Sequence, residues 1–225
     1  MTIGIILAVI FLLVIANILL KKNKNPTFRK ITSVIHKFLG VLFLGVAIAH
    51  LALVLPLIKQ RPIAMYLIGF IMIACAIAAL LSYLFRKKLK QHWITIHKIV
   101  ALVISICLVI HIYLGVSSLN EYKQIIENMD IKSVDVNQIV DGNYIGECDA
   151  GYIYAKVKVT IKDGEITAVK LLEHRTERGK AAEVIPDKIL QSHNVKVDAI
   201  TGATNSSKVI MKAAENALEQ NSKVD

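Results

Sequence analysis

Four long apolar stretches in the first half of the chain constrain its fold more than any other feature. The hydrocarbon layer of a bilayer is about 30 Å thick, so a helix that crosses it needs roughly 20 apolar residues. The stretches that approach or exceed this length are 3–20, 31–58, 63–85 and 93–119. The first has no basic residue before it and no small-x-small cleavage pattern after it, so we interpret it as a retained helix. The sequence therefore predicts an all-α four-helix membrane bundle over residues 1–119.

The charge distribution predicts how this bundle is oriented. All 17 acidic residues follow position 119, whereas nine of the 13 basic residues before it gather in two loops and the third connection offers only Lys59 and Arg61. The two basic loops contain Lys21, Lys22, Lys24, Arg29 and Lys30, and Arg86, Lys87, Lys88 and Lys90. Strongly basic loops stay in the cytoplasm, so the N-terminus and everything after residue 119 are expected outside a multi-pass protein of the cell (plasma) membrane. Basic residues confined to loops between apolar segments indicate contact with lipid, not a nucleic-acid interface.

Four histidines lie within the predicted membrane helices. His36 and His50 share the second helix and His97 and His111 the fourth, with the same fourteen-residue separation in each. Fourteen residues are close to whole turns and span roughly 21 Å, so each helix presents one histidine near each membrane face. Two facing imidazoles can supply both axial ligands of a haem iron. The pattern predicts two haems b, held by His36 with His97 and by His50 with His111; helix–helix hydrogen bonding is the alternative for each histidine.

The histidine pattern resembles four-helix b-type cytochromes and the membrane core of ferric reductase-like proteins. The resemblance covers about residues 31–115 and rests on the segments HKFLGVLFLGVAIAH and HKIVALVISICLVIH. The first and third helices contain no histidine, so they would pack around the cofactors. Gly40 and Gly45 would let a flat macrocycle approach the second helix closely.

After a polar connector over 120–140, the pattern changes to that of a small α+β domain over 141–225. Alternating apolar residues predict strands at 144–148, 152–161 and 165–172, with Asp163–Gly164 as a hairpin turn between the last two. Helices are expected around 180–191 and from about 206 to 219. The fold class is thus a membrane four-helix bundle followed by a small extracytoplasmic α+β domain.

The segment DAITGATNSS precedes the last predicted helix and is the candidate site of this domain. Gly202 and Ala203 leave the hydroxyl of Thr204 unshielded, and Ser206 or Ser207 is suited to cap the helix. Helix N-termini hold phosphate because their unpaired amides and positive dipole end point at it. Thr204 is therefore placed to carry a phosphate-linked cofactor, although such a segment is also typical of an ordinary helix start.

The same segment resembles the pattern D-x-x-[ST]-G-A-[TS] of FMN-binding domains, such as those of the sodium-pumping quinone reductase and the Rnf complex. The resemblance covers residues 141–219 and implies that an exported flavin transferase joins FMN covalently to Thr204 through a phosphoester. It also implies that the recognition motif consists of Asp198, Thr201, Gly202 and Ala203. Longer members carry Glu-Thr-x-Gly in mid-domain where this chain reads HRTERG, so Gly179 is a candidate flavin contact.

The predicted cofactors describe a transmembrane electron-transfer flavocytochrome. We expect electrons to pass between the quinone pool or an inner-side dehydrogenase and an extracytoplasmic partner, through two haems b and FMN. Flow in either direction is compatible with the sequence. Two alternatives remain: a reductase acting directly on an outer substrate such as ferric iron, and a non-redox membrane anchor or sensor whose flavin domain is structural.

Overall fold

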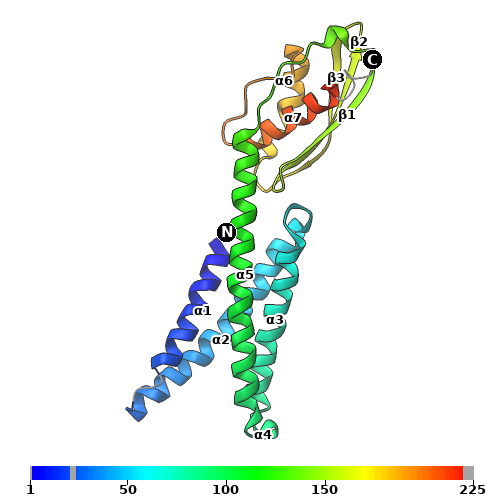
Figure 1. The fold of residues 1–225 in the computed structure, drawn as a ribbon. Helices are drawn as coiled ribbons and strands as arrows, with labels where there is room; N and C mark the ends of the chain where they lie inside the picture. The colour runs from blue at the N-terminus through cyan, green and yellow to red at the C-terminus, as the bar shows by residue number, and fades with distance from the viewer. Residues whose placement is uncertain (1, 21–23, 220–225) are drawn as a thin grey trace. The chain divides into compact units, whose positions relative to one another are not determined.

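The computed structural model describes residues 2–20 and 24–219; Lys21 and Lys22 of the first predicted basic loop lie outside this range. The chain divides into two compact units, Met1–Val116 and Ser117–Asp225. Each unit contains its own cluster of buried apolar side chains. Figure 1 traces both units along the chain.

Helices make up the first unit. They are α1 (Thr2–Leu20), α2 (Pro26–Val54), the short 3₁₀ helix η1 (Leu55–Gln60), α3 (Ile63–Leu84), the single turn α4 (Arg86–Leu89) and α5 (His92–Asn128). Helix α2 begins earlier than the apolar pattern predicts, because Asn25 accepts hydrogen bonds from the amides of Thr27 and Phe28 and Pro26 fits the first turn. Phe11 of α1 packs on Phe43 of α2 with ring centroids 5.5 Å apart.

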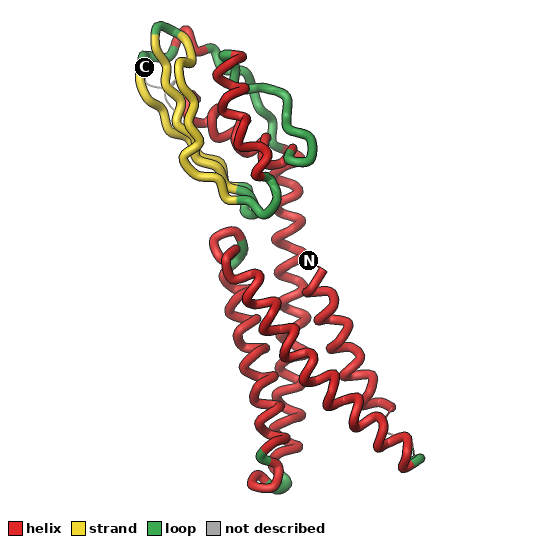
Figure 2. The backbone as a smooth tube through the Cα atoms, turned by 180° about the vertical axis from the view of Figure 1, so that it is seen from behind, coloured by secondary structure: helices red, strands yellow, loops and turns green. Residues whose placement is uncertain are grey.

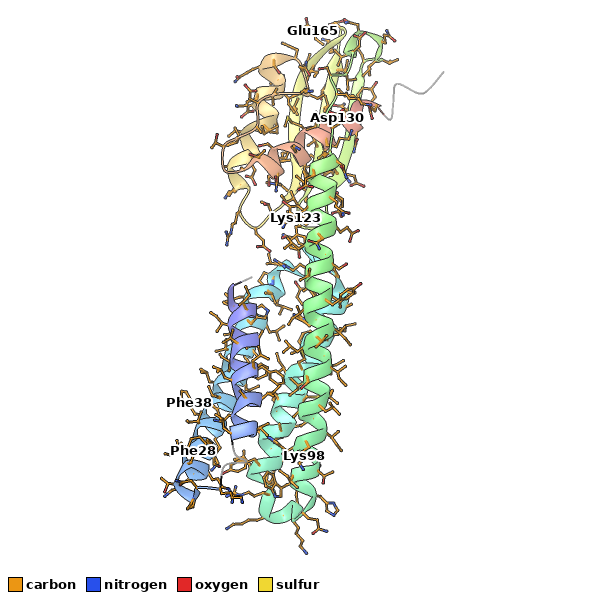
Figure 3. The ribbon with its side chains drawn as sticks, turned by 60° about the vertical axis from the view of Figure 1, so that its left-hand side comes forward. Phe28, Phe38, Lys98, Lys123, Asp130 and Glu165 are labelled. Carbon is orange, nitrogen blue, oxygen red and sulfur yellow. The ribbon has the colours of Figure 1, made fainter. Side chains whose placement is uncertain are left out.

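Within the described residues, three helical segments are long and apolar enough to cross a membrane: Pro26–Gln60, Ile63–Leu84 and His92–Asn128. The described apolar part of α1 is shorter, Ile3–Ile18. Large apolar side chains such as Phe38, which is 65% exposed, project from these helices (Figure 3). Such helices leave most of their apolar surface uncovered by protein, as expected of a region that lies in lipid. The prediction of an apolar, helical region is confirmed for these three segments, which by length and composition could cross a membrane.

The second unit contains a three-stranded antiparallel sheet in the order β1-β2-β3. The strands are β1 (Gly142–Asp149), β2 (Tyr154–Lys162) and β3 (Glu165–Arg175), close to the three predicted ranges. Asp163 and Gly164 both have positive φ, 54° and 74°, as the predicted tight hairpin turn requires. The hairpin that joins β2 to β3 is therefore confirmed, and Figure 2 shows all three strands side by side.

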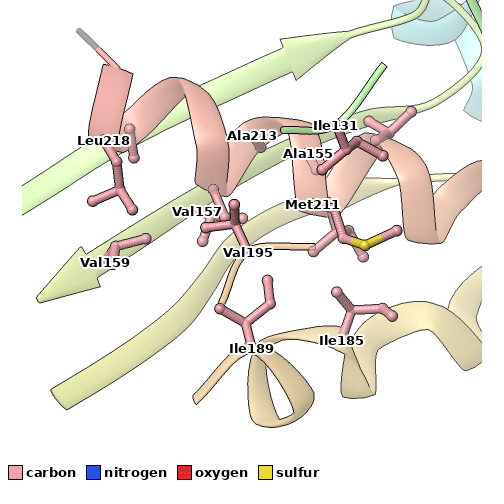
Figure 4. Packing of buried hydrophobic residues seen from close by; sticks show 14 of the residues in the cluster. Ile131, Ala155, Val157, Val159, Ile185, Ile189, Val195, Met211, Ala213 and Leu218 are labelled. Atoms are coloured by element: carbon pink, nitrogen blue, oxygen red, sulfur yellow. The ribbon is translucent and has the colours of Figure 1, made fainter. Parts of the chain in front are cut away.

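Helices α6 (Ile185–Ser192) and α7 (Thr204–Glu219) pack on the sheet, α7 against β1 and β2 and α6 against β3. Figure 4 shows the core between them, in which Val157 and Val159 of β2 meet Ile189 of α6 and Leu218 of α7. These side chains are at most 1% exposed, and burial of each stabilises the unit by about 1.5–3 kcal/mol. The α+β class predicted for this part of the chain is confirmed.

The first of the two predicted helices is interrupted. Residues Lys180–Val184 form the 3₁₀ helix η3, and the α-helix starts only at Ile185. Pro186 has no amide hydrogen and its ring clashes with the preceding turn, so it is tolerated only at the beginning of an α-helix. The proline thus sets where α6 begins, and apolar periodicity alone does not reveal this.

Candidate functional site

A tight turn leads into α7 and presents Thr204. The Ala203 amide donates to the Ile200 carbonyl over 2.9 Å, and Gly202 between them has a φ of 79°. That conformation favours glycine, because a side chain would be strained there. Thr204 is the first residue of α7 and is exposed, as are Thr201 and Gly202, whereas Ala203 is buried. The hydroxyl of Thr204 is therefore accessible beside the amides of the first helical turn.

Ser207 fixes this turn from inside the domain. Its buried hydroxyl donates to the Ala203 carbonyl over 3.0 Å and accepts from the Ile200 amide over 3.0 Å. Since α7 begins at Thr204, both predicted serines lie within the first helical turn and not ahead of it. Ser207 thereby joins the turn to the helix through its side chain.

Ser206 joins the start of α7 to the loop after β3. Its hydroxyl, 1% exposed, lies 3.2 Å from the hydroxyl of Thr176, which also accepts from the Gly179 amide over 2.9 Å. A Cβ placed on Gly179 would lie 2.5 Å from the Cβ of Ser206, so only glycine fits without movement. The structure thus brings Gly179 and Ser206 together. Sequence reasoning did not select Thr176, whose only signal was its place in HRTERG.

Asp198 lies on the exposed approach to the turn. Its backbone carbonyl accepts from the Lys188 ammonium group over 3.4 Å, and its side chain is exposed. Among the described residues, no hydrogen bond or ion pair joins Asp198 to Thr204.

His174 supports the loop after β3 from inside the domain. Its side chain is 2% exposed, and its Nδ1 lies 3.2 Å from a carboxylate oxygen of Glu183 in η3. This contact ties the end of β3 to the segment that follows Gly179. Neither residue was a predicted site residue.

The last turns of α5 pack against the first turns of α7. The Asn205 side-chain amide donates to the Tyr122 hydroxyl over 2.8 Å, and the Lys208 ammonium group donates to the Ile126 carbonyl over 3.0 Å. The second contact satisfies a carbonyl near the C-terminus of α5, where a cation is also favoured. More than eighty residues separate the partners, so no local pattern reveals these contacts.

In the first unit, His36 of α2 and His97 of α5 face each other with ring centroids 6.1 Å apart and ring planes at 62°. Two imidazoles bound at about 2.0 Å to opposite sides of one metal would place their ring centres roughly 6 Å apart. The Nδ1 of His97 lies 3.3 Å from the Ala79 carbonyl. When Nδ1 carries the proton it donates to that carbonyl, and Nε2 is left as the ligating nitrogen. The spacing of this pair fits shared ligation of a haem iron.

The second histidine pair lies beside glycines of the neighbouring helices. A Cβ on Gly4 of α1 would lie 3.9 Å from Cε1 of His50, and one on Gly69 of α3 would lie 4.0 Å from Cε1 of His111. A Cβ on Gly40 or Gly45 would meet nothing within 4 Å, so α2 has open space at both.

Within residues 2–20 and 24–219, no group of three or more His, Cys, Asp or Glu side chains is placed to hold a bare metal ion. Haem needs only two protein ligands, because its porphyrin supplies the other four. A pair of histidines is therefore a sufficient donor set for haem iron.

Comparison with protein families shows what the second unit resembles. Residues 151–219 match the family model of the FMN-binding domain. The expected likeness to FMN-binding domains is confirmed for these residues. They include β2, β3, α6, α7 and the whole turn that presents Thr204, and a match to the FMN-binding domain points to flavin-linked electron transfer. A comparison of the chain with curated proteins gives no match.

The match to the FMN-binding domain starts after β1, so it leaves out the end of α5. Tyr122 and Ile126 nevertheless contact α7 inside the same compact unit. Packing around the start of α7 therefore extends beyond the matched residues.

Proposed function

We propose that the chain is a membrane flavocytochrome that carries FMN as a phosphoester on Thr204 and two haems b between α2 and α5. The match of residues 151–219 to the FMN-binding domain is the observation that carries the flavin-linked part of this function. When bound, the haems exchange single electrons and the flavin exchanges one or two. The protein supplies ligands, burial and orientation.

The start of α7 supports Thr204 as the attachment residue. Its hydroxyl is exposed, and the amides of the first turn of a helix have no partner within the helix. Those amides and the positive end of the helix dipole would bind the phosphate of FMN. The turn anchored by Ser207 and the Thr176–Ser206 contact would hold Thr204 in place when the flavin transferase attaches the cofactor. Asp198, Thr201, Gly202 and Ala203 would be the segment that the transferase recognises.

The facing rings of His36 and His97 support a haem site between α2 and α5. We assign His50 and His111 to the second haem, because both lie one fourteen-residue step further along the same two helices. The hydrogen bond between His97 and Ala79 would orient the His97 imidazole for ligation. The glycines beside the second pair would admit a flat macrocycle.

In the proposed topology α1 also crosses the plasma membrane, which brings the number of membrane spans to four. The two basic loops face the cytoplasm, and the N-terminus and the second unit lie outside. The electron partners would be the quinone pool or an inner-side dehydrogenase and, outside, a soluble acceptor or donor. Both directions of flow fit this arrangement.

Covalent flavin on Thr204 is tested by expressing the chain with an exported flavin transferase. Thr204→Val should remove the flavin fluorescence of the denatured protein band, because valine keeps the shape of threonine but has no hydroxyl. Thr204→Ser keeps a hydroxyl and is the matched control. Fluorescence that persists in Thr204→Val would move the attachment to another residue.

Haem binding is tested by the Soret spectrum and the pyridine haemochrome assay of the purified chain. Wild type should contain two haems per chain, and His50→Ala or His97→Ala should lose one, because one imidazole leaves the iron without its second axial ligand. His92→Ala, at the exposed start of α5, is the control and should keep both. A colourless wild type, or unchanged haem in His97→Ala, contradicts the assigned pairing.

A further inference from the structure

Two tyrosine rings pack against each other in the second unit, and one of them contacts the residue after the proposed flavin attachment residue. The rings of Tyr122 and Tyr152 have centroids 5.2 Å apart and planes at 40°. Both side chains are half-buried, and Tyr122 packs against the core of the second unit. Paired aromatic rings at this spacing attract each other and offer a broad apolar surface.

The chain holds Tyr152 in a well-defined turn between β1 and β2. The Ala150 amide donates to the Ile153 carbonyl over 2.9 Å, and the Tyr152 amide donates to the Ala150 carbonyl over 3.1 Å. The Gly151 amide donates to the Asp149 carboxylate over 2.8 Å, and Gly151 has a φ of 79°, which glycine tolerates. This turn fixes where the Tyr152 ring lies.

Asn205 holds the other ring against the start of α7. Its side-chain amide donates to the Tyr122 hydroxyl over 2.8 Å, and it directly follows Thr204 in the chain. The Lys208 contact with the Ile126 carbonyl, one turn further along both helices, holds the same two helices together. Tyr122 of the aromatic pair therefore contacts the residue that directly follows Thr204.

We propose that Tyr122 and Tyr152 form the wall against which the isoalloxazine ring of FMN on Thr204 packs, with Asn205 positioning Tyr122. This inference rests on the proposed attachment to Thr204. The phosphate and five-carbon ribityl chain of FMN are longer than a tyrosine side chain. An isoalloxazine ring tethered at Thr204 can therefore reach Tyr122, which contacts the neighbouring Asn205. A flat, weakly polar ring system in water gains by covering an aromatic surface.

Tyr122 lies outside residues 151–219, which match the FMN-binding domain. The proposal therefore makes the end of α5 part of the flavin site. It also gives Asn205 a role that a simple helix start does not require, because its side chain bonds to Tyr122 and not to the backbone of its own turn.

The test compares two fluorescence readings on the full-length protein, purified in detergent after expression with the flavin transferase. Fluorescence of the denatured band measures covalent flavin, whereas emission of the native protein per covalent flavin measures stacking, since tyrosine rings quench a flavin that they touch. Loss of one aromatic contact should lower the ratio of stacked to free flavin roughly two- to tenfold. Native emission per flavin should therefore rise in Tyr122→Leu and in Tyr152→Leu, with denatured fluorescence unchanged.

Three further variants make the result specific. Tyr122→Phe removes the oxidisable phenol that quenches the flavin, so its emission should rise as in Tyr122→Leu. Asn205→Ala keeps that phenol and loses only the hydrogen bond that positions it, so its emission should lie between wild type and Tyr122→Leu. Tyr113→Leu changes a tyrosine of α5 that is 68% exposed, and should behave as wild type. If Tyr122→Leu fails to fold, Tyr122→Phe and Asn205→Ala still decide the outcome.

The possible failures are distinguishable. Covalent flavin in every variant with native emission equal to wild type overturns the aromatic wall and leaves Thr204 attachment intact. Absence of covalent flavin from wild type overturns the attachment and the wall together.

Discussion

Gly179→Ala should destabilise the start of α7, because the loop after β3 touches it too closely for any side chain. Gly179 has a φ of −92°, which alanine adopts without strain, so backbone conformation does not cause the effect. The added Cβ would lie 2.5 Å from the Cβ of Ser206 and 2.8 Å from Oγ1 of Thr176. Two carbon atoms normally pack at about 3.5–4.0 Å, so the loop or the first turn of α7 must move by roughly 1 Å.

The expected cost follows from two contributions. Overpacking of this kind costs about 1–3 kcal/mol. The Thr176–Ser206 hydrogen bond, which the movement breaks, contributes about 1 kcal/mol more. The sum, about 2–4 kcal/mol, corresponds to a roughly 30- to 700-fold higher population of the locally open state.

Hydrogen exchange of the full-length protein in detergent, followed by mass spectrometry of peptides from α7 and from 176–184, measures this opening. Gly179→Ala should speed exchange in both peptides, whereas Gly45→Ala, at a position with open space in the first unit, should leave them unchanged. Ser206→Gly removes the clashing side chain, so Gly179→Ala should cost less in the Ser206→Gly background than in wild type. Exchange in Gly179→Ala equal to wild type, or additive effects in the double variant, would refute the reasoning.

Four other predictions concern β1 and its neighbours. Gly146→Ala places a Cβ 2.7 Å from the Cα of Ala217, which is backbone and cannot rotate away, so hydrogen exchange should speed up throughout β1 and α7. Burial raises the pKa of the Cys148 thiol to about 11, so its alkylation at pH 8 should be about 100-fold slower in the native protein than after unfolding, and equal rates would contradict this. The Tyr154 hydroxyl donates to Glu147 over 2.5 Å, which raises the pKa of Tyr154 to about 12. The stability from this bond should be complete below pH 10 and decline as the pH rises towards 12, and Tyr154→Phe should remove that decline in a pH series of urea unfolding. The same hydrogen bond lowers the pKa of the Glu147 carboxyl, so its stabilisation should be complete above the ordinary glutamate pKa and be lost as the pH falls from there through the lowered pKa, and Glu147→Gln should abolish this acid-side loss.

Local sequence patterns predicted the elements that depend on neighbouring residues. Apolar length predicted the helices of the first unit, and alternation with the Asp163–Gly164 turn predicted the three strands. Element ends were predicted less well. Helix α5 continues to Asn128, nine residues beyond the apolar stretch, because the polar segment after residue 119 still favours a helix and buries Ile126 in the second unit.

The surroundings of Thr204 needed the tertiary structure. The motif around Thr204 is contiguous, so the sequence alone selected that residue. Thr176 and Ser206 are thirty residues apart, and Tyr122 and Asn205 are eighty-three apart. No periodicity connects positions so distant, because their contact depends on how α5, β3 and α7 pack around one core.

By itself the sequence determined which segments are apolar enough for a membrane and where the strands turn. It also selected Thr204 by its motif and four histidines by their equal spacing as candidate cofactor residues. Those features follow from the period of a helix, the alternation of a strand and the chemistry of single side chains. Only the tertiary structure decided that His36 faces His97, that Gly179 has no room for a side chain, and that Tyr122 stacks on Tyr152 beside the start of α7. Such contacts arise when elements pack, and packing depends on every side chain between them at once.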